Sequence, residues 1–187
     1  MTQDEFFNTV RDAIDPKFHC AAQAGFLEHE ETHHDGSSSR FRLNASAPHV
    51  AFSLDKPRMN PFEVLAPGLN SRNDLTVCCL TPKGIPLIFV IECKNSPSPG
   101  DAQHQIGCGI AFCKYLFELV RFRHGVQAEP KYFGVAVYRT RSPIKGLTRP
   151  SPVKFINQGN HGGLMRADCT SDVVLPLTAL IRATGIQ

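Results

Sequence analysis

The sequence lacks several patterns that mark common classes of protein. None of its apolar runs approaches the roughly 20 residues that a helix needs to cross a bilayer, so no membrane-spanning segment is expected. The first residues, MTQDEFFNTV, have neither the basic start nor the apolar core of a signal peptide, and secretion is not indicated. The given sequence also has no G-x-x-x-x-G-K-[ST] motif, so an ATP-driven motor, if one is needed, lies elsewhere.

The cysteines exclude two further classes of structure. There are seven, an odd number, and no two of them form a C-x-x-C pair. A disulfide framework or a cysteine-bound zinc ion is therefore not expected. The pattern fits a reducing, intracellular compartment better, either cytoplasm or nucleus.

The composition is that of an ordinary globular protein. Of the 187 residues, 42% are hydrophobic and 20% are charged, and this length suits one domain with its own core. The net charge of +3 is too small to indicate a nucleic-acid partner by itself. The charges are unevenly placed, however, because residues 121–154 hold eight Lys or Arg against one acidic residue. Such a region suits contacts with phosphates, and a solvated surface is the alternative.

The periodicity of apolar residues predicts an order of helices and strands. Helical spacing appears first near the N-terminus and again after residue 100, and segments rich in β-forming residues lie between. We expect helices over 3–14, 16–32 and 101–123, and strands within 40–54 and over 74–80, 85–91 and 131–138. The tail adds another strand or helix within 172–184.

One stretch, GIPLIFVIECKNSPSPG, combines a buried strand with charges at its end. Five large apolar residues, 87–91, lead directly into Glu92 and Lys94. A three-residue loop ending in Gly84 makes the preceding hairpin symmetrical about Lys83, which places Asp74 opposite Glu92. Opposed residues project from the same face of a sheet, and Lys94 shares that face.

Two carboxylates that converge in a partly buried place repel each other, and a divalent cation relieves the repulsion. Carboxylate oxygens suit Mg²⁺ or Mn²⁺, and such an ion activates water and stabilises charge on a phosphoryl group. Lys94 is then suited to orient the water or to offset the phosphate charge. The alternative is that Glu92 and Lys94 merely pair where a core strand reaches solvent.

These residues resemble a known family. Asn73-Asp74, the hairpin and Glu92-Cys93-Lys94 resemble the signature of the PD-(D/E)XK nuclease superfamily, and GIPLIFVIECK is most similar to the nuclease domain of type I restriction enzymes. Asn73 stands where the motif has Pro, and the hairpin is longer than in the restriction enzymes.

The resemblance implies a fold and a set of roles. The fold is α/β, with a restriction-endonuclease-like αβββαβ core over about 5–140, a mixed central sheet flanked by helices, and a C-terminal extension over 141–187. Asp74 and Glu92 would be metal ligands, Lys94 the catalytic lysine, and the carbonyl of Cys93 an additional metal ligand.

Many nucleases of this superfamily also carry a glutamine early in the next helix, and this sequence offers two. Helical phase brings Gln103 nearer than Gln105 to the apolar stripe that begins at Ile106, so Gln103 is expected at the site and Gln105 is the alternative. A polar first turn without a role in catalysis would explain either residue equally well.

Basic residues that follow the last core strand are candidates for contacts with the phosphates of a nucleic acid. They are Arg139, Arg141 and Lys145, and a solvated loop is the alternative.

A competing metal motif lies near the N-terminus. His29-Glu30-Glu31-Thr32-His33 matches H-E-x-x-H, which on a helix binds zinc through two histidines and uses Glu30 as the general base of a peptidase. The surrounding residues are strongly polar, unlike a buried zinc helix. The segment has an alternative role in a nuclease. Some nucleases of the superfamily take an additional acidic residue from the first helix, and Glu28 or Glu31 would then join the site.

The sequence as a whole predicts a Mg²⁺- or Mn²⁺-dependent nuclease that hydrolyses DNA, with RNA as the alternative substrate. A degenerate member that binds nucleic acid or protein without cutting, and a zinc peptidase, are the other classes. Dimerisation, or a place within a larger protein, stays open.

Overall fold

The described part of the chain forms a mixed α/β fold with two mixed sheets and three helices. The structure is a computed structural model that describes residues 1–32, 38–56, 64–65, 71–94, 99–139, 154–159, 162–169 and 174–186. The helices are α1 (Gln3–Asp12), α2 (Pro99–His124) and α3 (Leu177–Ala183). The strands are β1 (Phe26–Thr32), β2 (Ser38–Asn44), β3 (His49–Phe52), β4 (Leu75–Leu80), β5 (Pro86–Lys94), β6 (Lys131–Arg139), β7 (Lys154–Gly159), β8 (Gly162–Cys169) and β9 (Val174–Pro176).

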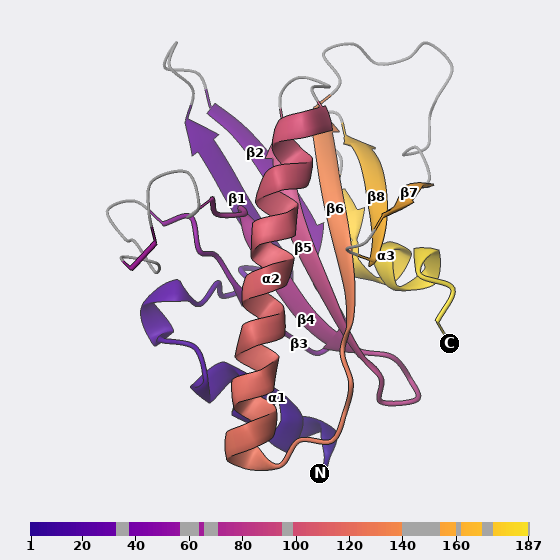
Figure 1. Ribbon diagram of the computed structural model, residues 1–187. Helices are drawn as coiled ribbons and strands as arrows, with labels where there is room; N and C mark the ends of the chain where they lie inside the picture. Colours follow the sequence, from indigo (N-terminus) through magenta and orange to yellow (C-terminus); the bar gives the residue numbers. More distant parts are fainter. Residues whose placement is uncertain are drawn as a thin grey trace.

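The larger sheet has the order β3-β4-β5-β6-β8-β7. Its first three strands are antiparallel, β5, β6 and β8 run parallel, and β7 returns antiparallel to β8. Two parallel strands need a long crossover, and α2 provides it between β5 and β6. Figure 1 shows α2 lying along one face of this sheet.

The larger sheet is covered on both faces. Buried side chains of α1 and α2 pack against one face, where Val10, Ile110 and Phe117 belong to the same buried cluster as Val90. On the other face, the smaller sheet β1-β2-β9 and α3 pack against residues such as Phe89. β5 lies in the middle of these layers, and its residues from Pro86 to Glu92 are all buried. Burial on both faces explains its unbroken apolar run.

The predicted register of the β4–β5 hairpin is confirmed. Leu75 pairs with Ile91, as symmetry about Lys83 requires. Gly84 takes a φ of +78°, a conformation that favours glycine, and its N–H donates to the carbonyl of Thr81 at 2.9 Å. The local chemistry of the turn thus sets which residues meet at the far end of the strands.

The helix predicted over 16–32 is wrong. Only a short 3-10 turn, Pro16–Phe18, is present, and β1 follows as an extended strand that pairs antiparallel with β2. The outer side of this pair carries opposite charges, because Glu28 and Arg42 approach to 2.6 Å. Pairing with the next strand along the chain has overridden the local helical preference of the Glu- and His-rich segment.

The zinc-peptidase interpretation loses its basis with that helix. The motif works on a helix, where residues four apart lie on one face, but β1 is an extended strand in which His29 and Glu30 point to opposite faces. His33, the second histidine of the motif, lies outside the described residues.

The other predicted elements are found with modest changes of boundary. The segment 40–54 contains two strands, β2 and β3, instead of one, and 172–184 contains both β9 and α3. The C-terminal extension joins both sheets, since β8 pairs with β6 and β9 pairs with β2. The described cysteines with placed side chains are all free, and no described helix combines the length and the apolar character that a membrane crossing requires.

Candidate active site

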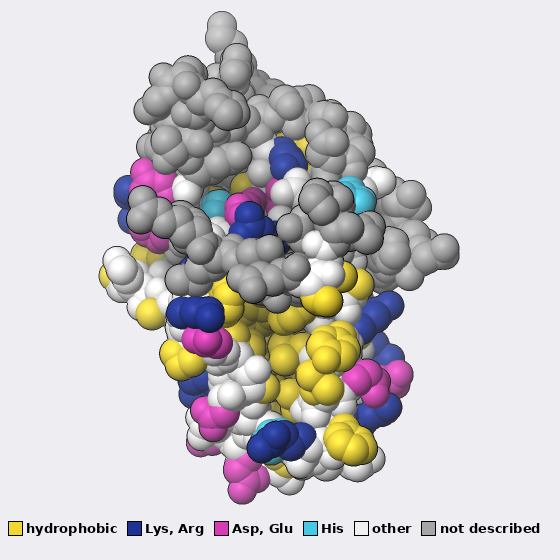
Figure 2. Space-filling view, turned by 60° about the vertical axis from the view of Figure 1, so that its left-hand side comes forward, with side chains coloured by type: hydrophobic (Ala, Val, Ile, Leu, Met, Phe, Trp, Pro, Cys, Tyr) yellow, Lys and Arg dark blue, Asp and Glu magenta, His cyan; other side chains and the backbone are white. Residues whose placement is uncertain are grey.

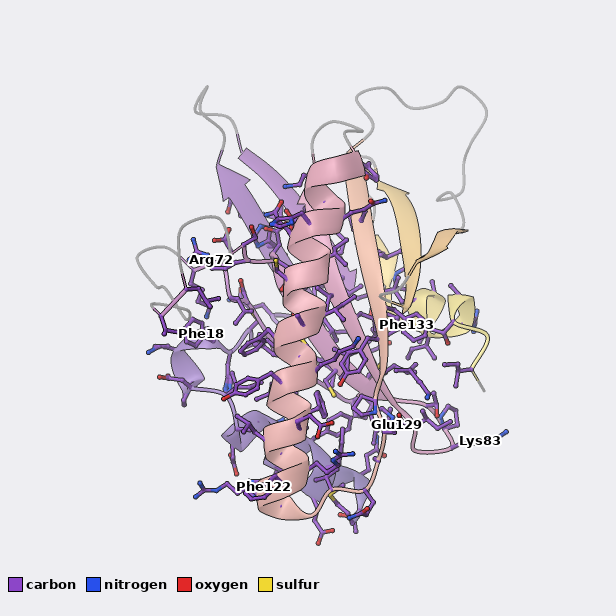
Figure 3. The ribbon with its side chains drawn as sticks, in the orientation of Figure 1. Phe18, Arg72, Lys83, Phe122, Glu129 and Phe133 are labelled. Carbon is purple, nitrogen blue, oxygen red and sulfur yellow. The ribbon has the colours of Figure 1, made fainter. Side chains whose placement is uncertain are left out.

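The predicted residues meet where β5 ends. Asp74 directly precedes β4, while Glu92 and Lys94 belong to the last three residues of β5. The hairpin turn lies at the opposite end of the sheet, as the positions of Arg72 and Lys83 in Figure 3 show. Figure 2 shows a histidine lying together with acidic and basic side chains above an area of hydrophobic side chains, and other charged side chains border that area.

Each carboxylate accepts a hydrogen bond from a backbone N–H of the opposite arm of the hairpin. The N–H of Asp74 donates to Glu92 Oε2 at 3.3 Å, and the N–H of Cys93 donates to Asp74 Oδ2 at 2.6 Å. Both side chains are withdrawn from solvent, with 9% of Asp74 and 1% of Glu92 exposed. The hairpin therefore brings two acidic side chains together at a site that is almost completely buried.

The charge balance of this place favours an added cation. Burial raises the pKa of Glu92 to about 8, and the nearby Asp74 carboxylate acts in the same direction. Lys94 opposes the shift, since its Nζ lies 2.7 Å from Glu92 Oε1. The pKa stays high despite this lysine, so one ammonium does not compensate for both carboxylates.

The site glutamine is Gln105, and the preference for Gln103 is corrected. Lys94 Nζ donates to Gln105 Oε1, and Gln105 Nε2 donates to the carbonyl of Arg72 at 3.1 Å. Gln103 is exposed. Gln105 lies about 100° from Ile106 on the helix, on the opposite side from Gln103, and this side of the helix meets Lys94 at the end of β5.

Close packing of α2 fixes the segment before Asp74. Asn73 is fully buried and donates from Nδ2 to Thr76 Oγ1 at 3.0 Å. A Cβ at Gly109 would lie 2.4 Å from Asn73 Oδ1 and 2.6 Å from Val90 Cγ1, so only glycine lets the helix approach this closely. Sequence reasoning missed Gly109, although a glycine inside an otherwise helical pattern was a signal of a packing role.

A histidine from the smaller sheet is the second residue that sequence reasoning missed here. His29 Nε2 lies 3.3 Å from Asp74 Oδ1. The signal was present in the alternation of β1, where Leu27 and His29 share one face.

The donor set fits a hard divalent cation. Asp74 and Glu92 offer carboxylate oxygens, and the Cys93 carbonyl faces the same side as its N–H, because the two groups of a strand residue share an edge. Among the described residues, no group of three or more His, Cys, Asp or Glu side chains is arranged as a ready metal cage. Mg²⁺ commonly uses only one or two carboxylates and keeps its remaining positions for water and phosphate oxygens. Two acids and a carbonyl therefore suit Mg²⁺ or Mn²⁺.

The expected phosphate contacts are placed only in part. Arg139 ends β6, which runs parallel to β5 with Tyr138 beside Lys94, so its backbone lies at the same end of the sheet as the site. The side chain of Arg139, and the whole of Arg141 and Lys145, lie outside the described parts of the chain.

Of the two acids considered as additional ligands, only Glu28 has a described side chain, and it does not join the site. Glu28 pairs with Arg42 at 2.6 Å on the outer side of β1. The side chain of Glu31 is not among those that the structure describes.

No protein-family model, curated protein sequence or solved structure matches this chain. The functional argument therefore depends on the geometry of the site itself.

Proposed function

We propose that this chain is a metal-dependent nuclease that hydrolyses the phosphodiester bonds of DNA, with RNA as the alternative substrate. The observation that carries the proposal is the meeting of two buried carboxylates from opposite strands, Asp74 and Glu92, with Lys94 bound to one of them. A buried acid whose pKa is raised to about 8, in contact with a specific cationic partner, is typical of a functional site.

The order of elements supports a restriction-endonuclease-like core as part of this proposal. α1, β3, β4, β5, α2 and β6 follow the sequence αβββαβ, with β1 and β2 inserted after α1. The core strands lie side by side in the order β3-β4-β5-β6. The acids stand at the ends of its two central strands, where buried neighbours hold them rigidly.

The residues divide the work of hydrolysis. Asp74, Glu92 and the Cys93 carbonyl would hold Mg²⁺ or Mn²⁺, which when bound activates water and stabilises charge on the phosphate. Lys94 directs its Nζ protons toward the carboxylate of Glu92. From this position the ammonium can orient the attacking water and offset the charge of the phosphate. Gln105 accepts from Lys94 and so restricts the ammonium to that side of the site.

Glu92 must lose a proton to act as a ligand. With a pKa of about 8 it is mostly protonated at pH 7 when no cation is present. Cation binding therefore releases protons, and we expect affinity to increase as the pH is raised toward 8.

The test is incubation of the purified chain with circular DNA, linear DNA and RNA, in EDTA, Mg²⁺ or Mn²⁺. Cleavage should require a metal and should fall at least about 100-fold in Glu92→Gln and Asp74→Asn, which keep the size of each side chain. The matched control is Glu30→Gln, because Glu30 is exposed on the outer side of β1, where it pairs with Arg40. It should cleave normally.

Two results would contradict the proposal. Full activity of Glu92→Gln would remove this site from the reaction. Inactivity on every substrate with both metals, in a folded chain that still binds DNA, would favour a binding module that does not cut.

A further inference from the structure

The aspartate of the site is contacted by a residue that no nuclease signature in the sequence singled out. His29 Nε2 lies 3.3 Å from Asp74 Oδ1, and only 16% of the histidine side chain is exposed. The other oxygen, Oδ2, accepts from the N–H of Cys93. The two oxygens of Asp74 therefore contact two different strands: Oδ1 lies next to His29 of β1, and Oδ2 accepts from Cys93 of β5.

The position of His29 follows from the alternation of β1. Leu27 faces inward and is fully buried, and His29, two residues on, shares that face opposite Phe41 of β2. Glu28 and Glu30 face outward, toward Arg42 and Arg40. A slip of one residue would bury the two glutamates, so the register that keeps Leu27 inside also directs His29 to Asp74.

The contact pairs a histidine nitrogen with a carboxylate oxygen at 3.3 Å. An ionised carboxylate only accepts hydrogen bonds, so His29 can hold Oδ1 as a donor when Nε2 carries the proton. A donor at Oδ1 opposes rotation of the carboxylate about its χ2 bond, while Oδ2 is already held by Cys93. Partners of this kind, which hold a metal ligand without touching the metal, typically change metal affinity by about 10–100-fold when removed.

We propose that His29 is a positioning residue of the metal site, which orients the Asp74 carboxylate for a divalent cation. The inference rests on the proposed function, because it assumes that Asp74 binds the cation. The proposal also assigns His29, the first residue of the H-E-x-x-H segment, a role that does not involve zinc.

The test measures Mn²⁺ binding directly, by calorimetry or by the electron paramagnetic resonance of free Mn²⁺, on the full chain without nucleic acid. His29→Ala should raise the Kd for Mn²⁺ by about 10–100-fold. His29→Gln, whose amide N–H can take the place of Nε2–H, should stay within about threefold of the wild type. Rescue by Gln separates positioning from a general structural role.

A matched histidine serves as the control. His49 is also partly buried, but its Nδ1 bonds to the carbonyl of Ala47, and it pairs with Cys79 near the hairpin turn. His49→Ala should leave the Kd for Mn²⁺ unchanged. If His29→Ala does not fold, His29→Asn, which is too short to reach Oδ1, takes its place with the same expected loss.

The outcomes distinguish the two proposals. If the wild type binds Mn²⁺, Asp74→Asn does not, and His29→Ala binds as the wild type does, the role of His29 is overturned and the metal site stands. Equal weakening in His29→Ala and His29→Gln also overturns it. If the wild type does not bind Mn²⁺, both proposals fail.

Discussion

The two ends of the β4–β5 hairpin are built in different ways. At the turn, the bonds are local, because Gly84 and Ile85 donate to Thr81 across three or four residues. A cavity of about 630 Å³ lies there, between the hairpin turn and the loop after α2. At the other end, charges are buried and their partners come from distant segments, such as Gln105 of α2. The turn sets the register with ordinary turn chemistry, and the register presents the acids that the rest of the chain then holds.

The largest expected effect separates two lysines of this hairpin. Lys94→Ala should lower metal-dependent cleavage by about 10²–10⁴-fold, because it removes the charged donor beside Glu92. Lys83→Ala, at the exposed tip of the turn, should cleave as the wild type does. Initial rates of cleavage of labelled DNA measure the effect of each substitution. Equal rates for the two variants would show that the two ends of the hairpin do not differ in function.

The next effect is on the pH dependence of stability. Glu92 has a pKa of about 8 in the folded chain against an ordinary value of 4.5, so its contribution is fully present below pH 4.5 and is lost as the pH rises through 8. In EDTA, the free energy of unfolding should fall by up to about 1.4 kcal/mol per pH unit in this window. Glu92→Gln should flatten the curve.

Urea unfolding at pH 5, 6, 7 and 8 provides this measurement, and added Mg²⁺ should also reduce the slope in the wild type. Lys83→Ala is the control at the turn end and should keep the wild-type slope. Parallel curves for wild type and Glu92→Gln would show that Glu92 does not carry the shifted pKa.

Two glycines sharpen the comparison at the level of packing. Gly109→Ala should destabilise the fold by about 1–3 kcal/mol and reduce cleavage, because its Cβ would meet Asn73 and Val90. In an unconstrained helix the same change would stabilise by about 1 kcal/mol, so the sign is diagnostic. Gly84→Ala, at a φ of +78° with open space around it, should cost only about 1 kcal/mol and leave the cleavage rate unchanged.

The smallest effect concerns the two glutamines of α2. Gln105→Ala should lower the cleavage rate by about 3–10-fold, since it frees Lys94 and loses one neutral hydrogen bond to the carbonyl of Arg72. The exposed Gln103→Ala should have no effect. A larger loss in Gln103→Ala would restore the original preference from helical phase.

What the sequence could predict depended on how local the cause was. The meeting of Asp74 and Glu92 followed from one turn, because hairpin symmetry about Lys83 needs no information from outside residues 74–92. The strong apolar periodicity of 101–123 likewise predicted α2 without knowledge of its neighbours.

What it could not predict depended on partners outside each segment. β1 is rich in Glu and His, and it is a strand because β2, the next strand along the chain, supplies opposed arginines and a buried Leu43. The contacts of Gln105 with Lys94 and Arg72, and of His29 with Asp74, arise only once the helix and the smaller sheet have docked. These are effects of tertiary structure that periodicity does not encode.

The unequal reach of these contacts also orders events during folding. The hairpin closes a short loop, whereas the contacts of Gln105 with Arg72 and of His29 with Asp74 join segments more than 30 residues apart, and such long-range contacts form more slowly. A newly made chain with only the hairpin in place has two repelling acids and neither of these partners. Competence at this site therefore comes last, after the whole chain has assembled around it.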